Sequence, residues 1–318
     1  MEDYPRSLVE FNERFATEEA CYQYLATIRW PEGFICPKCL HNEAWQTKTG
    51  LYKCRKCKWR TSTTAGTIFH DSRKPMKLWF EAMWHITTQK YGANALGLQR
   101  VLSLGSYNTA WKWLHRLRRA MVRPCREMLS GTVEVDETYI GGERHGKRGR
   151  GAENKALVAI GVEDIARDVD SKGIGRIRLK RIPDASAESL IGFISTNVVP
   201  GSLIRTDGWS GYESLQKVGY EHIVVGAKEV NIAHLVAALL KRWLLSTYQG
   251  AVNPSHLDYY LDEYTFRFNR RTSTYRGKLF YRLVQQAVTI KPIHGRDIAA
   301  CASAEKCDPC EIHHVPFL

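Results

Sequence analysis

Hydrophobic positions recur along the chain with two different periods, which divide it into a helical part and a mixed α/β part. Between residues 76 and 121, apolar residues return every three or four positions, as on one face of an amphipathic helix. From residue 131 onward, short segments alternate apolar and polar residues, as half-buried strands do, with helical segments between them. We therefore expect helices first and a sheet with helices afterwards.

Two helical regions are predicted in the first part. Residues 76–90 form a core helix with an apolar stripe of Trp79, Phe80, Met83, Trp84 and Ile86. Residues 93–121 form two helices around a turn at Gly105, and the second is both apolar and basic. This pattern matches a helix-turn-helix whose second helix enters the major groove of DNA; a helical hairpin that binds nothing is the alternative. The expected DNA contacts of this helix are Lys112, Arg116 and Arg119.

The second part predicts three strands, a helix, a strand, a helix, a strand and a long helix. The segments are residues 132–140, 156–162, 175–182, 186–198, 203–205, 212–218, 222–225 and 231–245. This is the order of a ribonuclease-H-like α/β domain, in which helices flank one mixed sheet. A last helix over residues 259–271 is expected to cover the sheet. Its core residues would be Tyr260, Leu261, Tyr264 and Phe268, with Arg267, Arg270 and Arg271 outward.

The spacing of four cysteines predicts a structural zinc ribbon. Cys36 and Cys39 form one CxxC pair, and Cys54 and Cys57 form a second after fourteen residues. Each pair presents two thiolates from one tight turn, so two facing turns supply four tetrahedral ligands and leave no open position. The apolar residues expected around this metal are Phe34, Trp45 and Trp59.

The other cysteines form no comparable array. Near the C-terminus, Cys307, Cys310, His313 and His314 have the spacing of a second zinc site, and a frayed tail is the alternative. Buried or incidental thiols are expected at Cys21, Cys125 and Cys301.

The distribution of charge points to a polyanionic partner. The formal net charge is +13, and residues 1–130 hold 21 Lys/Arg against 11 Asp/Glu. This part is expected to supply most of the affinity for DNA. Residues 141–151 add five glycines and four cations, which predicts a loop that moulds to a phosphate backbone; a solvated hairpin tip is the alternative. The cations of this loop are Arg144, Lys147, Arg148 and Arg150.

Nothing in the sequence predicts a membrane segment. No apolar run approaches the roughly 18 residues that span a bilayer, and the acidic N-terminus has no signal-peptide core. A cytoplasmic protein is therefore expected.

Two aspartates are candidate ligands of catalytic metals. Asp136 lies in the first strand of the predicted sheet and Asp207 at the end of the fourth. These strands are neighbours in a ribonuclease-H-like sheet, so both carboxylates are expected at one point. Oxygen ligands suit Mg²⁺ or Mn²⁺, and two such ions can activate a nucleophile and stabilise the leaving oxygen of a phosphodiester. Alternation puts Glu134 on the face of Asp136, as a spare candidate ligand, and Glu137 on the opposite face.

Several of these motifs together resemble a known family. VEVDETYIGG, IRTDGWSGY, LVAALLKRWLLSTYQGAV and HLDYYLDEYTFRFNRR are similar to zinc-ribbon insertion-sequence transposases of the ISXO-like branch, in the DDE superfamily. The resemblance covers essentially residues 20–290. It implies a bacterial protein that binds terminal inverted repeats of double-stranded DNA, assembles there as a homo-oligomer, and cleaves and transfers strands. It makes Asp136 and Asp207 the first two catalytic acids.

The third catalytic position departs from the plain DDE pattern. The resemblance aligns His234 with the expected acidic residue and Lys241 with a basic one. Seven residues are two helical turns, so Lys241 shares a face with His234 and is expected to hold a DNA phosphate. The alternative is that His234 is not a ligand and that this copy is inactive.

Four domains follow from these predictions. They are an N-terminal helix with the zinc ribbon (1–70), a helix-turn-helix region (71–130), a ribonuclease-H-like catalytic domain (131–290) and a C-terminal tail (291–318). The predicted function is a DDE-type DNA transposase, and a domesticated or inactive DNA-binding regulator is the alternative. A non-mobile nuclease of the same fold is a third possibility.

Overall fold

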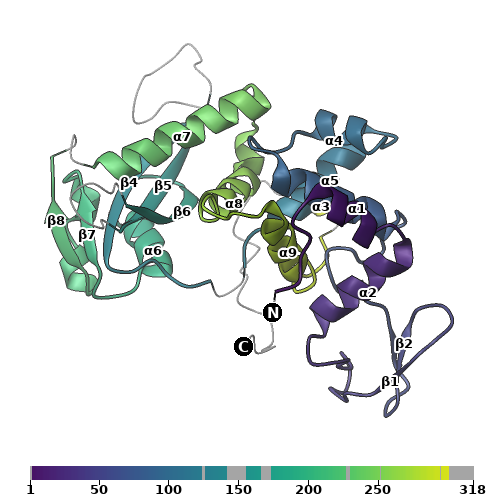
Figure 1. Cartoon of the computed structure of the whole chain (residues 1–318). Coiled ribbons are helices and arrows are strands. Elements are labelled where there is room, and N and C mark those ends of the chain that lie inside the picture. Colours follow the sequence, from purple (N-terminus) through teal and green to yellow (C-terminus); the bar gives the residue numbers. More distant parts are fainter. Residues whose placement is uncertain are drawn as a thin grey trace. The chain divides into compact units, whose positions relative to one another are not determined.

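The computed structural model describes residues 2–123, 126–141, 155–165, 173–226, 230–250, 252–293 and 295–300. They form two compact units, one of residues 1–123 and 273–300 and the other within residues 124–272 (Figure 1). Several predicted features lie outside the described residues. They are the basic loop with Arg144, Lys147, Arg148 and Arg150, the C-terminal Cys307, Cys310, His313 and His314, and the thiols of Cys125 and Cys301.

The second unit is built on a five-stranded mixed sheet in the order β6-β5-β4-β7-β8. Its strands are β4 Thr132–Ile140, β5 Ala156–Asp164, β6 Ile174–Ile182, β7 Leu203–Thr206 and β8 Glu221–Val224. β4, β5 and β6 pair antiparallel, whereas β7 runs parallel to both β4 and β8. The predicted mixed sheet and the neighbouring positions of its first and fourth strands are therefore confirmed.

Side chains that alternate along β5 pack against helices on both faces of this sheet. Val158 and Ile160 belong to a core with α7 Asn231–Tyr248 and α8 Leu257–Phe268. Ala159 faces the opposite core, which contains α6 Ala187–Asn197. Because β5 is buried on both faces, it is the nearly continuous apolar run typical of a central strand. A short 3-10 helix, η3 Pro254–His256, precedes α8.

Two details of this unit differ from the prediction. Residues 212–218 do not form one helix. Two 3-10 turns occupy this region instead, η1 Ser210–Tyr212 and η2 Leu215–Val218. Gly219 ends the second turn at φ +89°, a conformation that glycine adopts without strain. Arg267 does not point outward, because its Nε donates at 2.9 Å to the fully buried Glu263 carboxylate. The four core residues predicted for α8 are all buried.

The first unit contains the predicted core helix, α3 Met76–Thr88, whose five stripe residues are all buried. Its other helices are α1 Leu8–Arg14, α2 Glu18–Arg29, α4 Ala95–Val101, α5 Tyr107–Arg119, α9 Arg276–Ala287 and α10 Gly295–Ala300. α3 has no capping side chain of its own. The Glu18 carboxylate instead accepts the N–H groups of Met76 (2.5 Å) and Lys77 (3.0 Å). A glutamate from another helix thus accepts the hydrogen bonds of two N–H groups in the first turn of α3.

Helix α9 packs against α2 and α3. The predicted division had assigned residues up to 290 to the sheet domain. That four-domain division stays a prediction. The packing of α9 is relevant to its third boundary, at residue 290, because α9 contacts helices of the first unit.

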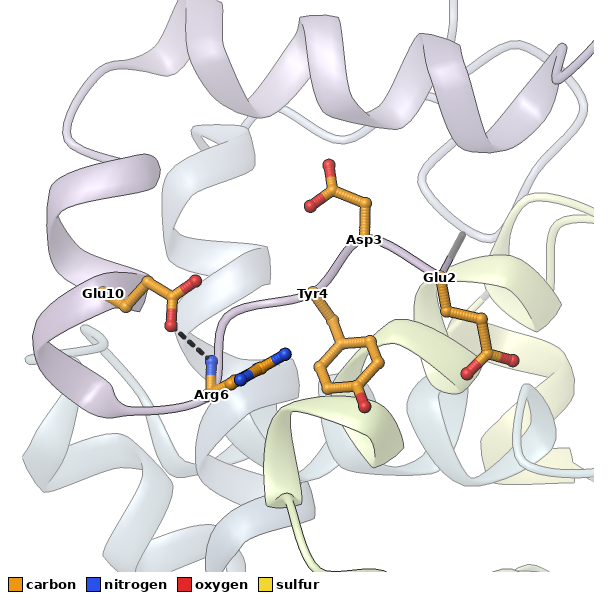
Figure 2. Close-up of a pocket in the computed structure, with 5 residues that line it drawn as sticks. All are labelled: Glu2, Asp3, Tyr4, Arg6 and Glu10. Carbon is orange, nitrogen blue, oxygen red and sulfur yellow. Dashed lines mark hydrogen bonds between the residues drawn. The ribbon is translucent and has the colours of Figure 1, made fainter.

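The N-terminal residues close over α9 and line a cavity of 610 Å³ (Figure 2). A Cβ at Gly277 would lie 1.5 Å from the Pro5 carbonyl oxygen, so this approach requires glycine. The three carboxylates of the cavity already have partners. Glu2 pairs with Lys278 and Arg282, Asp3 with Arg14, and Glu10 accepts the Arg6 N–H at 2.8 Å (Figure 2). The cavity is thus part of the attachment of the N-terminus.

Helices α4 and α5 form the predicted pair around a turn. Their first residues are capped by Asn94 and Ser106, whose side chains accept N–H groups of the following turn. His115 and Arg118, two further basic residues of α5, are buried. Lys112, Arg116 and Arg119 are partly exposed, and burial lowers the pKa of Arg116. No helix among the described residues is long and apolar enough to cross a membrane.

Candidate metal centres

The four cysteines of the predicted ribbon come together on two matching turns. The ribbon sheet consists of β1 Ala44–Gln46, β2 Tyr52–Cys54 and β3 Arg60–Thr61, paired antiparallel. In the first turn, Leu40 donates its N–H to the Cys36 carbonyl, and in the second, Lys58 donates to that of Cys54. Leu40 (φ 58°) and Lys58 (φ 60°) also share a left-handed backbone. The two CxxC motifs therefore fold alike and face each other.

The sulfur atoms of these turns fit a tetrahedral metal. All four lie within 4.8 Å of one another, and the Cys36–Cys57 and Cys39–Cys54 sulfurs are 3.6 Å apart. Tetrahedral zinc with Zn–S bonds of about 2.3 Å separates its sulfurs by about 3.8 Å. Spacing and ligand type therefore both suit structural Zn²⁺.

The aromatic residues around this centre differ from the prediction. Trp45 and Trp59 do not pack as a core, since 46% and 47% of their surfaces remain exposed. The aromatic cluster consists instead of Trp30, Phe34 and Tyr52, with ring centroids 4.9 to 5.6 Å apart. A two-residue and two three-residue strands have too little surface to bury every aromatic, and the metal replaces much of a core.

Parallel pairing of β4 and β7 brings Asp136 and Asp207 to one edge of the sheet. The last register pair of these strands is Glu134 with Arg205, and each aspartate lies two residues further along its own chain. Gly208, at φ +81°, turns the backbone immediately after Asp207, and a Cβ there would lie 2.7 Å from the Val224 side chain. The Asp207 carboxylate accepts the Trp209 N–H at 3.1 Å, which fixes the turn.

His234 reaches this edge from the first turn of α7. Its Nε2 lies 3.2 Å from Oδ2 of Asp136, and about half of its side chain remains exposed. Asp136 itself is only 7% exposed. Burial raises the pKa of Asp136 to about 6; His234 and a backbone N–H oppose this increase, whereas the charges of Glu137 and Asp207 add to it. A buried carboxylate among like charges favours a bound cation.

The remaining predicted residues are placed as follows. Lys241 is exposed, two turns after His234 on the same face of α7. Glu137 lies on the opposite face of β4, where Tyr212 donates to it at 2.9 Å. Among the described residues, the four cysteines alone form a group of three or more possible ligands within 4.8 Å. The acidic edge is thus more open than the ribbon centre.

Glu134 has a role that sequence reasoning did not find. It is 1% exposed, and its Oε2 accepts the N–H groups of Ile232 (2.9 Å) and Ala233 (3.1 Å). Because α7 has no capping side chain at Val230, Glu134 acts as its N-terminal cap. The absence of Ser, Thr, Asp or Asn before residue 231 was the signal that a distant acceptor was needed.

Arg205 extends this arrangement to the strand of Asp207. Its Nη1 lies 3.4 Å from Glu134 and 3.4 Å from Asp164. Glu134 thus shares a strand with Asp136, caps the helix of His234 and pairs with an arginine two residues before Asp207. Both of its oxygens are engaged, which argues against the predicted spare-ligand role.

Both centres lie in segments that match known family models. Residues 128–269 match the family model of the ISXO2-like transposase domain, and residues 16–60 match that of the transposase zinc-ribbon domain. Residues 128–269 therefore correspond to the ISXO2-like transposase domain family, and residues 16–60 to the transposase zinc-ribbon family. The family resemblance predicted from the sequence is confirmed, and the ribbon match covers all four cysteines.

One relative of this chain comes from a transposable element. Over 278 residues the chain is 28% identical to an uncharacterized protein in transposable element ISH50 of Halobacterium salinarum, covering 80% of this chain and 91% of that protein. A solved simian T-cell lymphotropic virus intasome, in complex with PP2A regulatory subunit B56 gamma, matches at 13% identity with a TM-score of 0.32. That match covers 64% of this chain and 72% of the other, and it adds nothing to the fold described above.

Proposed function

We propose that this protein is a transposase that binds the terminal inverted repeats of an insertion sequence and catalyses metal-dependent strand cleavage and strand transfer. The observation that supports the proposal is the position of Asp136, Asp207 and His234 near one edge of the sheet. Asp136 in β4 and Asp207 after β7 each lie two residues beyond the last register pair of these parallel strands, and His234 contacts Asp136 from α7. The strand order supports a ribonuclease-H-like fold for this unit.

In this proposal the three side chains hold Mg²⁺ or Mn²⁺. When bound, such ions activate a water or 3′-hydroxyl and stabilise the leaving oxygen. Asp136, with its raised pKa, supplies a charge that its buried position leaves poorly compensated. Asp207 offers a carboxylate fixed by the Trp209 N–H. Lys241, exposed on the His234 face, would receive a DNA phosphate.

The basic first part of the chain would bind the DNA before the DNA is cut. The proposed contacts of α5 are Lys112, Arg116 and Arg119, and assembly of a homo-oligomer would bring two element ends together. Residues 1–130, with 21 cations against 11 anions, are the main candidates for phosphate contact.

The test is cleavage of a labelled terminal-repeat duplex by the full chain. Asp136→Ala and Asp207→Ala should each reduce the rate by about a thousandfold or more, since metal stabilisation of the transition state is worth several kcal/mol. Glu137→Gln, on the other face of β4, is the matched control and should retain most activity. Cleavage that survives Asp207→Ala would refute this site.

A second candidate is a DNA-binding regulator with an inactive site. The histidine where the DDE pattern has an acidic residue favours it. Repeat binding without cleavage under either metal would support the regulator.

A further inference from the structure

The zinc ribbon carries a surface that the structure does not use for its own packing. It consists of the exposed rings of Trp45 and Trp59 with the cations Lys38, Arg55 and Lys58, and we call it the basic-aromatic patch. Lys58 Nζ lies 4.7 Å and Arg55 5.6 Å from the Trp45 ring, and Lys38 Nζ lies 5.1 Å from that of Trp59. Two rings, each with at least one cation over it, thus lie beside the two cysteine turns.

Exposed indoles of this kind need an explanation. A tryptophan buries a large apolar area when it packs, and leaving nearly half of two such rings in water forgoes part of that stabilisation. The ribbon has an aromatic cluster in Trp30, Phe34 and Tyr52, which neither exposed ring joins. Exposed aromatic residues beside arginine are typical of contact surfaces.

The charge of the ribbon selects the kind of partner. Residues 36–60 hold seven Lys/Arg and one Asp/Glu, a formal excess of +6. Zinc with four thiolates would contribute −2, which still leaves the ribbon strongly positive. The single acidic side chain, Glu43, pairs with Arg55 at 3.2 Å. The patch therefore complements a polyanion.

We propose that the basic-aromatic patch binds the sugar-phosphate backbone of duplex DNA, an inference that rests on the proposed function and adds a contact surface to it. Cations already lie over the indole rings, so an unpaired base would have to displace them to stack. A phosphate can instead pair with a cation in place, while the sugar packs against the ring. Backbone contacts of this kind fix position and carry no sequence information.

The experiment measures binding of the full zinc-loaded chain to a short labelled duplex of mixed sequence, by fluorescence anisotropy over a range of salt. Lys58→Ala should weaken binding about fivefold at physiological salt and reduce the slope of log K against log salt by about 0.9, as loss of one phosphate contact does. The matched control is Lys48→Ala, in the turn between β1 and β2. It removes the same charge from the same ribbon and should change affinity less than Lys58→Ala.

The double variant Trp45→Ala, Trp59→Ala tests the aromatic part. It should weaken binding by about tenfold, in the range known for aromatic contacts with nucleic acid, and leave the salt slope unchanged because no charge is lost. Zinc content equal to that of the parent shows that the ribbon is intact. Parental affinity of the double variant, or equal losses for Lys48→Ala and Lys58→Ala, would overturn the patch.

A single-stranded probe separates the two modes of DNA contact. The duplex should bind at least as tightly, whereas tighter single-strand binding that depends on both tryptophans would overturn the backbone assignment. Different results would contradict the DNA-binding patch and the catalytic proposal. Loss of DNA binding in the tryptophan variant together with cleavage by Asp207→Ala would leave the patch standing and remove the catalytic site.

Discussion

The two candidate metal centres are specified by the chain in opposite ways. In the ribbon, all four ligands lie between residues 36 and 57, and each pair sits on one turn with its own hydrogen bonds. At the acidic edge, Asp136 lies in β4, Asp207 directly follows β7, and His234 lies in α7. Local backbone geometry therefore builds the first centre, whereas sheet register and a helix cap build the second.

This difference predicts different kinds of sensitivity. A local centre depends on its own ligands and tolerates changes elsewhere in the chain. A centre assembled from distant elements depends also on residues that touch no metal, such as Glu134.

The largest effect is expected in the ribbon. Cys36→Ser with Cys39→Ser should abolish zinc binding and unfold the ribbon, because zinc binding of about 10 kcal/mol or more is coupled to folding in such modules. Zinc per chain and circular dichroism measure this effect. Cys21→Ser is the control, since that thiol is buried and alone, and it should retain one zinc. Tight zinc binding by the double variant would contradict a four-cysteine centre.

The next effect concerns the metal preference of the acidic edge. Two carboxylates and a neutral imidazole bring less negative charge than three carboxylates, and manganese accepts nitrogen more readily than magnesium. Manganese should therefore support faster cleavage, and His234→Glu should shift the preference toward magnesium. His234→Ala should cost less activity than either aspartate variant. Equal rates with both metals in the parent and in His234→Glu would remove His234 from the site.

Loss of the α7 cap should have an intermediate effect. Glu134→Ala leaves two backbone N–H groups without their acceptor and removes one of the two carboxylate partners of Arg205, so about 2–3 kcal/mol of unfolding free energy should be lost. Glu134→Gln keeps an acceptor oxygen and should lose less. Denaturant unfolding and hydrogen exchange at Ile232 and Ala233 measure the change. Unchanged protection of both amides in the alanine variant would contradict the cap.

Glu18→Ala sharpens this test, because Glu18 caps α3 in the same manner. Both variants should destabilise their helix, but only Glu134→Ala should change the metal concentration needed for cleavage. Identical metal dependence of the two variants would make Glu134 a purely structural residue.

The smallest effect is expected at Asp164. Its contact with Arg205 is 3.4 Å long and partly exposed, so Asp164→Asn should change stability by less than about 1 kcal/mol. Denaturant unfolding measures it against the parent. A loss as large as that of Glu134→Ala would mean that the ion pairs of Arg205, and not the cap of α7, account for the stabilisation by Glu134.

Patterns that depend on near neighbours in the chain were predicted from the sequence. The cysteine spacing predicted the ribbon cluster, and alternation placed Glu134 and Asp136 on one face of β4 and Glu137 on the other. The apolar stripes of α3 and α8 predicted their buried residues, because a helix repeats within a few residues. The order of elements predicted β7 beside β4, since few topologies place a parallel strand after such a meander.

Only the tertiary structure decided which polar groups meet and which apolar groups stay exposed. Trp45 and Trp59 look like core residues in the sequence, and their exposure follows from how little surface the ribbon offers. Residues 212–218 alternate too briefly to distinguish an α-helix from the two 3-10 turns that pack there. The contacts of Glu134 with α7, and of His234 with Asp136, join residues about 100 positions apart, and a local pattern carries no information about such pairs.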